Sequence, residues 1–211
     1  MSGCSYDYVH DGVEIDRRSF ETIRAESDLT GFPEGAESVV VRMIHASGQT
    51  DLTDDTRISS GAVEAARTAL AAGAPILCDV MMVASGVTRS RLPADNHVLC
   101  LVGDRRIPRL ATELETTTTA AAVHLWAPLL DGAVVAIGNA PTALFALLEL
   151  IDAGAPRPAV IVGAPVGFIG ATESCDALLA RSDLEHVTVL GRRGGSAITA
   201  AAVNALASTA E

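Results

Sequence analysis

The sequence predicts an α/β fold, with a mostly parallel sheet of five or six strands and helices on both faces, in a single domain over residues 1–211. Three observations predict this fold. Short apolar runs alternate with helical patterns from about residue 39 to the end, as in repeated βα units. The runs are continuously apolar, which is typical of strands covered on both faces. Glycine-rich turns follow most of the runs.

Six apolar runs are the predicted strands. They are rich in valine, isoleucine, leucine and alanine, and each is short enough for a buried strand. Because continuous apolar runs fit a parallel sheet, we expect the carboxyl ends of these strands to meet along one edge. The predicted strands cover residues 39–44, 75–80, 97–101, 133–137, 159–162 and 187–190.

Helix start and stop signals divide the segments between the strands. Pro141 precedes one helix, and Gly73 and Gly154 follow two, because proline suits the first helical turn and glycine suits the C-terminal cap. An amphipathic pattern predicts a further helix near the N-terminus, and residues 1–5 are expected to be disordered. The predicted helices cover residues 17–29, 60–72, 142–153, 172–179 and 196–207.

The composition excludes several classes of function. A net charge of −11 and an aromatic content of 3% disfavour nucleic acid as a partner, and the charge also disfavours anionic membranes. The chain has no lysine, which excludes Schiff-base chemistry and a P-loop lysine. The four cysteines show no spacing suited to a metal site. Without a signal peptide or membrane span, a cytoplasmic protein is expected, with no membrane partner.

Three polar residues interrupt or end the apolar runs. His45 follows the first predicted strand, where its imidazole, with an ordinary pKa of about 6.5, could act as a general acid/base or only as a structural group. Arg42 lies inside that run, so it either pairs with an acid or reaches a ligand. Asp79 ends the second run, where a cap or turn role is favoured over catalysis.

A glycine-rich turn with two arginines follows the last predicted strand. Arg192 and Arg193 stand there before Gly194, Gly195 and Ser196, at the start of a helix. Helix N-termini and arginines both bind anions, so this turn is a candidate site for carboxylate groups. The alternative is a tight turn with solvated arginines.

Motifs in a fixed order run along nearly the whole chain. Among them are Val-Arg-Met-Ile-His at 41–45, Gly-Ala-Pro-Ile-Leu-Cys-Asp at 73–79 and Ile-Gly-Asn-Ala-Pro-Thr-Ala at 137–143. In their order and spacing they resemble the precorrin-8X methylmutase family of cobalamin biosynthesis. The other segments that carry the resemblance are residues 6–8, 15–20, 23–26, 82–84, 86–88, 165–168 and 194–197.

The resemblance implies an isomerase that moves a methyl group from C-11 to C-12 of precorrin-8X, a polycarboxylate corrinoid, giving hydrogenobyrinate. It implies His45 as the proton donor and acceptor, and Ser19 and Arg42 as substrate contacts. It also implies a homodimer that holds the substrate near the subunit interface. The expected chemistry uses no cofactor and no metal. Residues 192–196 are the further groups that we expect to bind the substrate carboxylates.

Three alternatives stand beside this interpretation. The same reaction could use cobalt-precorrin-8 and give cobyrinate. The protein could instead be a corrinoid carrier without catalytic activity. A nucleotide-dependent domain, flavodoxin-like or methyltransferase-like, is disfavoured because the glycines at 163, 167 and 170 do not have the spacing of the dinucleotide-binding motif.

Overall fold

A six-stranded sheet forms the centre of the computed structural model, which describes residues 6–208. The strand order is β1-β6-β5-β4-β2-β3, and every pair is parallel except β1 with β6. The predicted fold class is therefore confirmed, whereas the expected disorder of residues 1–5 lies outside the described residues. The strands are β1 (Thr56–Ile58), β2 (Ile76–Cys78), β3 (Val98–Leu99), β4 (Val134–Ile137), β5 (Val160–Gly163) and β6 (His186–Val189).

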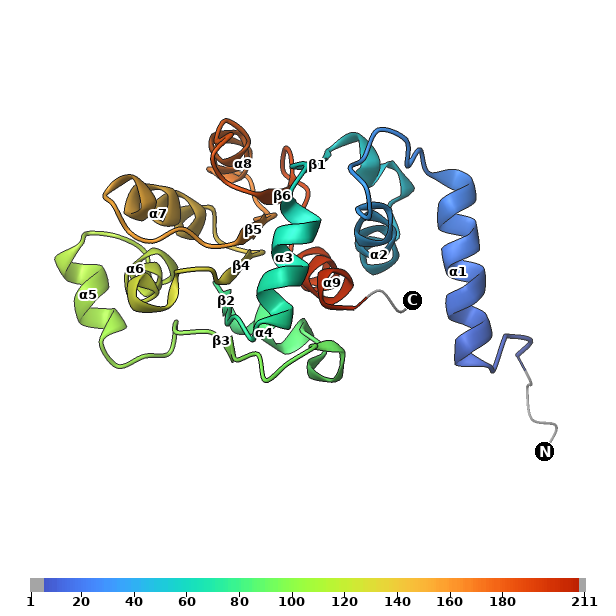
Figure 1. The fold of residues 1–211 in the computed structure, drawn as a ribbon, viewed down its shortest axis with the longest axis horizontal. Coiled ribbons are helices and arrows are strands. Elements are labelled where there is room, and N and C mark those ends of the chain that lie inside the picture. The colour runs from blue at the N-terminus through green and yellow to red at the C-terminus, as the bar shows by residue number, and fades with distance from the viewer. Residues whose placement is uncertain (1–5, 209–211) are drawn as a thin grey trace.

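Helices cover both faces of the sheet, as predicted (Figure 1). Val134 and Ala136 of β4 pack in a core with α2, α3, α4 and α9, while Val135 and Ile137 pack on the opposite face with α6, α7 and α8. This alternation is the two-residue period of a strand buried on both sides. The helices are α1 (Gly12–Glu26), α2 (Glu37–Ser47), α3 (Ala62–Ala71), α4 (Met81–Gly86), α5 (Ile107–Glu113), α6 (Thr118–His124), α7 (Pro141–Asp152), α8 (Ala171–Leu179) and α9 (Ser196–Ala207), with 3-10 helices η1 (Thr50–Asp54), η2 (Arg89–Arg91) and η3 (Ala127–Leu129).

The predicted first strand, residues 39–44, is wrong, because this segment forms the middle of helix α2. Val39, Val40 and Val41 are all fully buried, since α2 lies between α9 and α1 and has little free face. A short apolar run of this kind fits a buried helix as well as a buried strand. Gly48, in a left-handed conformation with φ of 68°, is the glycine cap that ends the helix.

Strand β1 was not predicted, and it is the antiparallel edge of the sheet. Thr56 pairs with Val189 and Ile58 with Val187. Its three residues carry Arg57 and follow two aspartates, so the segment lacks the apolar signal of the other strands. The strand total still falls within the predicted range, because β1 takes the place of the misassigned segment 39–44.

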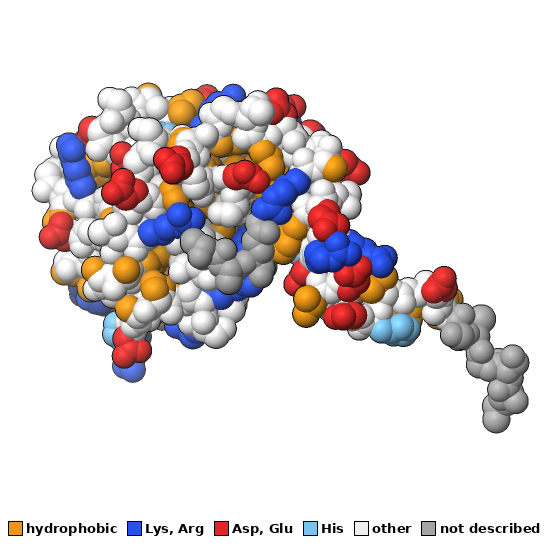
Figure 2. Space-filling view, turned by 45° about the vertical axis from the view of Figure 1, so that its right-hand side comes forward, with side chains coloured by type: hydrophobic (Ala, Val, Ile, Leu, Met, Phe, Trp, Pro, Cys, Tyr) orange, Lys and Arg blue, Asp and Glu red, His pale blue; other side chains and the backbone are white. Residues whose placement is uncertain are grey.

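Helix α1 lies at the periphery of the molecule, beyond α2 (Figure 1). It begins earlier than predicted, because the Asp11 carboxylate accepts a hydrogen bond from the Val13 N–H at 3.0 Å and caps it. Phe20 and Ile23 attach it to the core, whereas its N-terminal end projects away from the rest of the protein (Figure 2). Over the part of the chain that the structure describes, no helix has both the length and the apolar character needed to cross a membrane.

Candidate active site

His45 lies in the last turn of α2 and not at the end of a strand, which corrects its predicted setting. Its side chain is exposed, and its ring meets the Phe20 ring edge-on with 4.9 Å between centroids. The Arg42 guanidinium lies over the same Phe20 ring, 5.3 Å from its centroid. Phe20 is therefore the shared contact of the two predicted site residues. Sequence reasoning did not single it out, although a phenylalanine is rare in this chain.

A hollow of about 420 Å³ is lined by both His45 and Ser19, two of the residues that the resemblance assigns to the site. One wall is α1 and the other is the C-terminal end of α2 with the turn that follows. The Ser19 hydroxyl donates a hydrogen bond to the Ile15 carbonyl oxygen at 2.7 Å, so its oxygen keeps acceptor capacity. The residues lining the hollow are Arg18, Ser19, Thr22, Ile23, Glu26, Ile44, His45, Gly48 and Thr50.

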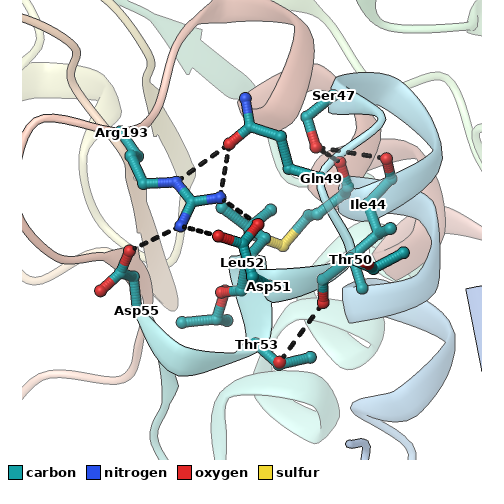
Figure 3. Close-up of polar contacts among 11 residues, drawn as sticks. Ile44, Ser47, Gln49, Thr50, Asp51, Leu52, Thr53, Asp55 and Arg193 are labelled. Atoms are coloured by element: carbon teal, nitrogen blue, oxygen red, sulfur yellow. Dashed lines mark hydrogen bonds and ion pairs between the residues drawn. The ribbon is translucent and has the colours of Figure 1, made fainter. Parts of the chain in front are cut away.

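Arg193 does not point into open solvent, because it is bound to the segment that follows His45 (Figure 3). Its Nε and one terminal nitrogen donate to Gln49 Oε1 at 2.9 and 2.6 Å. The two terminal nitrogens donate to the Asp51 carboxylate at 2.7 and 3.1 Å, and one also donates to Asp55 at 3.1 Å. A residue of the predicted anion site is thus joined to the turn beside the predicted acid.

The Asp51 carboxylate is electrostatically tied to this arginine. The hydrogen bonds from Arg193 hold the pKa of Asp51 below its ordinary value. Because the folded-state pKa is lowered, the ion pair stabilises the fold at pH values above about 4, and this contribution is lost as the pH falls through the lowered pKa. The network is therefore formed throughout the neutral pH range.

The rest of the predicted carboxylate-binding turn is packed against the loop that follows β5. The Gly195 N–H donates to the Ala164 carbonyl oxygen at 2.9 Å, so this donor is already used within the protein. A Cβ atom at Gly194 would lie 2.4 Å from that same oxygen, which explains the need for glycine. Ser196 is buried at the start of α9, while Arg192 is exposed over the ring of Phe168.

Asp79 is a structural residue, as the sequence favoured. Its buried carboxylate accepts hydrogen bonds from the backbone N–H groups of Gly138, Asn139 and Ala140 at 3.1, 2.9 and 2.8 Å. Burial raises the pKa of this carboxyl group, and the three hydrogen bonds oppose the rise. The contact joins the carboxyl ends of β2 and β4, the point where the strand order reverses and where α/β proteins commonly bind ligands. In this chain the backbone N–H groups at this point, which could otherwise bind an anionic ligand, are occupied by the Asp79 carboxylate.

Large apolar side chains are exposed at two places at the carboxyl edge of the sheet, at the start of α4 and in the loop between β5 and α8. Met81 and Met82 follow β2, and Val166, Phe168 and Ile169 follow β5. Phe168 and Ile169 have 81% and 88% of their surface exposed. Side chains of this kind typically mark surfaces that bind a ligand or another protein. Hydrophobicity alone could not identify them, because the same residue types fill the core.

Known proteins match this chain along nearly its whole length. The sequence model of the precorrin-8X methylmutase family matches residues 14–209. A precorrin-8X methylmutase from Pseudomonas aeruginosa is 59% identical over 206 residues, which are 97% of this chain and 99% of that protein. A cobalt-precorrin-8 methylmutase from Priestia megaterium is 33% identical over 199 residues, which are 94% of this chain and 88% of that protein.

The fold is also that of a solved structure. The crystal structure of precorrin-8X methylmutase from Thermus thermophilus superposes with a TM-score of 0.84 and 41% sequence identity. The match covers 93% of this chain and 95% of that one. Sequence and fold therefore agree on the same family.

Proposed function

This chain belongs to the precorrin-8X methylmutase family, and from that premise we propose that it is the isomerase that converts precorrin-8X into hydrogenobyrinate. A methyl group moves from C-11 to C-12 of the macrocycle, so the product has the same atoms as the substrate. No oxidant, reductant or second substrate is needed. The observation that carries the proposal is the hollow between α1 and α2, whose wall holds both His45 and Ser19.

We propose that His45 is the general acid/base of the reaction. Proton transfer from its imidazolium to the conjugated macrocycle or a ring nitrogen makes the ring electron-poor. The bond from the methyl group to C-11 then breaks as the bond to C-12 forms, and the imidazole takes the proton back. General acid catalysis contributes about 10²–10⁴-fold, and the rest must come from holding the ring in a reactive shape.

The substrate is a polycarboxylate, so cationic and hydrogen-bonding groups must surround the hollow. Ser19 lies on its wall, and Arg42 lies on the same turn of α2 as His45. We assign Arg42 to the substrate because a guanidinium can donate to a carboxylate. Ser19 is assigned because its hydroxyl, which donates to the Ile15 carbonyl oxygen in this structure, can rotate to donate to a carboxylate or can accept a hydrogen bond from the substrate. Arg192 is exposed at the carboxyl edge of the sheet and is a further candidate for the same role.

We infer that the working enzyme is a homodimer whose interface lies next to the hollow. Support comes from the exposed apolar residues at the start of α4 and in the loop after β5, and from the volume of the hollow. Its volume of about 420 Å³ is in the lower half of the range for drug-sized ligands, although a corrinoid with its carboxylate arms is larger than most drugs. A second protomer would extend the site.

The expected solution behaviour is a stable dimer. Light scattering coupled to size exclusion should give twice the mass of one chain, and Phe168→Ser should shift the population toward monomer with loss of activity. The matched control is Leu129→Ser, a change at another exposed apolar residue in η3, which should leave the mass unchanged. A fully active wild-type monomer would contradict the inferred interface site.

A cytoplasmic location is consistent with the cysteines. Cys78, Cys100 and Cys175 are free thiols, and two of them are buried. Free thiols are the normal state in the reducing cytoplasm. We therefore propose that the enzyme works there.

Anaerobic incubation with precorrin-8X tests the proposed function. The visible spectrum should change to that of hydrogenobyrinate in many turnovers per protein molecule. A bound-ligand spectrum without turnover would favour the carrier. Parallel incubation with cobalt-precorrin-8 separates the remaining alternative, and we expect the metal-free substrate to react faster because identity is higher to the relatives named for it. Turnover of the cobalt substrate alone would overturn this assignment.

A further inference from the structure

Arg193 joins two segments that lie far apart in the sequence. It belongs to the loop between β6 and α9, and its partners lie in the segment 49–55 that follows α2 (Figure 3). Gln49 is only four residues after His45, and Gly48, which ends the helix, lies between them. A side chain that fixes this segment therefore fixes the end of the helix that carries His45.

All the donor groups of this arginine are used within the protein. A guanidinium has five N–H groups, and Arg193 makes five hydrogen bonds to the side chains of Gln49, Asp51 and Asp55. No N–H group is left over for a substrate carboxylate in this arrangement. The structure therefore gives no support to the predicted direct contact between Arg193 and the substrate.

The half of the segment nearest β1 is also attached to the sheet and the core, because the Thr56 hydroxyl donates to the Leu52 carbonyl oxygen at 2.8 Å and the Leu52 side chain is fully buried. The Leu190 N–H donates to the Asp55 carbonyl oxygen at 2.9 Å, and β1 begins one residue later. Nearer to His45, the Ser47 hydroxyl bonds only within α2, to the carbonyl oxygens of Met43 and Ile44. Gln49 and Asp51 are thus linked to the loop after β6 through Arg193.

We propose that Arg193 is a positioning residue that holds the segment 49–55, and with it the last turn of α2 and His45, in the geometry needed for proton transfer. The inference rests on the proposed function, because it depends on His45 as the acid. In this role Arg193 acts through the segment beside His45, the proposed acid, and not through the direct contact with the substrate that the sequence analysis expects. A displacement of about 1 Å at a reacting group can cost about 10²-fold in rate.

A positioning role and a substrate-binding role for Arg193 predict different kinetic results when its partner Asp51 is substituted. If Arg193 positions His45, Asp51→Asn and Arg193→Gln should each lower kcat by about 10- to 100-fold with little change in KM. The double variant should then be no worse than Arg193→Gln alone, because both changes remove the same link. If Arg193 binds substrate, Arg193→Gln should raise KM, whereas Asp51→Asn should leave kcat unchanged.

Two further variants separate positioning from general stability. Gln49→Leu removes the acceptor of two hydrogen bonds and should reproduce the loss in kcat. Gln49→Glu keeps an oxygen acceptor at this position and should keep kcat near the wild-type value. The matched control is Arg181→Gln. Arg181 bonds Asp152 and Asp183 in a comparable surface network, on the α7 and α8 side of the sheet. This control should leave kcat and KM unchanged.

A measurement without substrate tests the link between Arg193 and His45 separately from the proposed function. The imidazole NMR signals of His45 should shift in Arg193→Gln and not in Arg181→Gln, and the Asp51 pKa should rise toward about 3.9 in Arg193→Gln. If wild-type protein fails to convert precorrin-8X, the function is wrong, but shifted His45 signals would still establish the link. Unshifted His45 signals, or a pure KM effect, would overturn the positioning role.

Discussion

Replacing His45 with alanine is expected to lower kcat for the rearrangement by about 10²–10⁴-fold, the usual contribution of a general acid. KM should change little, because the imidazole is assigned to proton transfer and not to holding the carboxylates. The free energy of unfolding should change by no more than about 1 kcal/mol, since the exposed ring loses only its edge contact with Phe20.

The matched control for this variant is His124→Ala. His124 is also an exposed histidine in the last turn of a helix, but α6 lies on the opposite face of the sheet. Single-turnover spectra of both variants with precorrin-8X, recorded beside thermal unfolding curves, make the comparison. A His45→Ala protein that turns over near the wild-type rate would remove this residue from the mechanism.

Replacing Asp79 with alanine is expected to destabilise the protein by about 3–5 kcal/mol. The change leaves three buried or half-buried N–H groups, at positions 138–140, without their acceptor, and each such group costs about 1–3 kcal/mol. It also removes a negative charge from the N-terminal end of α7. For a domain stabilised by about 5–15 kcal/mol this is a large part of the total, equivalent to about 10 °C in Tm.

Chemical denaturation and calorimetry would measure this loss. Asp79→Asn should be intermediate, because its amide oxygen can still accept hydrogen bonds while its NH₂ group faces the N–H donors. The control is Asp176→Ala, at an exposed acid in the second half of α8, which should change the stability by less than about 0.5 kcal/mol. If the Asp79→Ala protein is as stable as wild type, these backbone groups are not held in the way described.

The fold class could be predicted because five of the six strands carry a strong local signal. Helices α3, α7 and α9 were placed within about two residues, since glycine, proline and serine mark their ends. Segment 39–44 was misassigned because its apolar run has no period that separates a buried helix from a buried strand. Gly48 does not resolve this ambiguity, because a glycine fits a turn after a strand as well as a helix cap.

The candidate site was predicted only in part. The resemblance named His45 and Ser19, and the hollow brings them together, but no local pattern could show that α1 and α2 share it. The contact between Arg193 and Asp51 spans 142 residues of sequence and has no signal in either segment. Long-range polar pairs of this kind depend on how the loops pack, which a single sequence does not encode in any local pattern.

The peripheral position of α1 has a consequence for changing the specificity of the enzyme. Helix α1 forms the wall of the hollow that holds Ser19. This helix is not part of the repeated βα units and attaches to the core through Phe20 and Ile23. Its hollow-facing positions, such as Thr22 and Glu26, are exposed and can be varied without disturbing the central fold. Libraries for altered corrinoid selectivity should therefore begin with α1, where new side chains can meet a different tetrapyrrole while His45 stays on its buried helix.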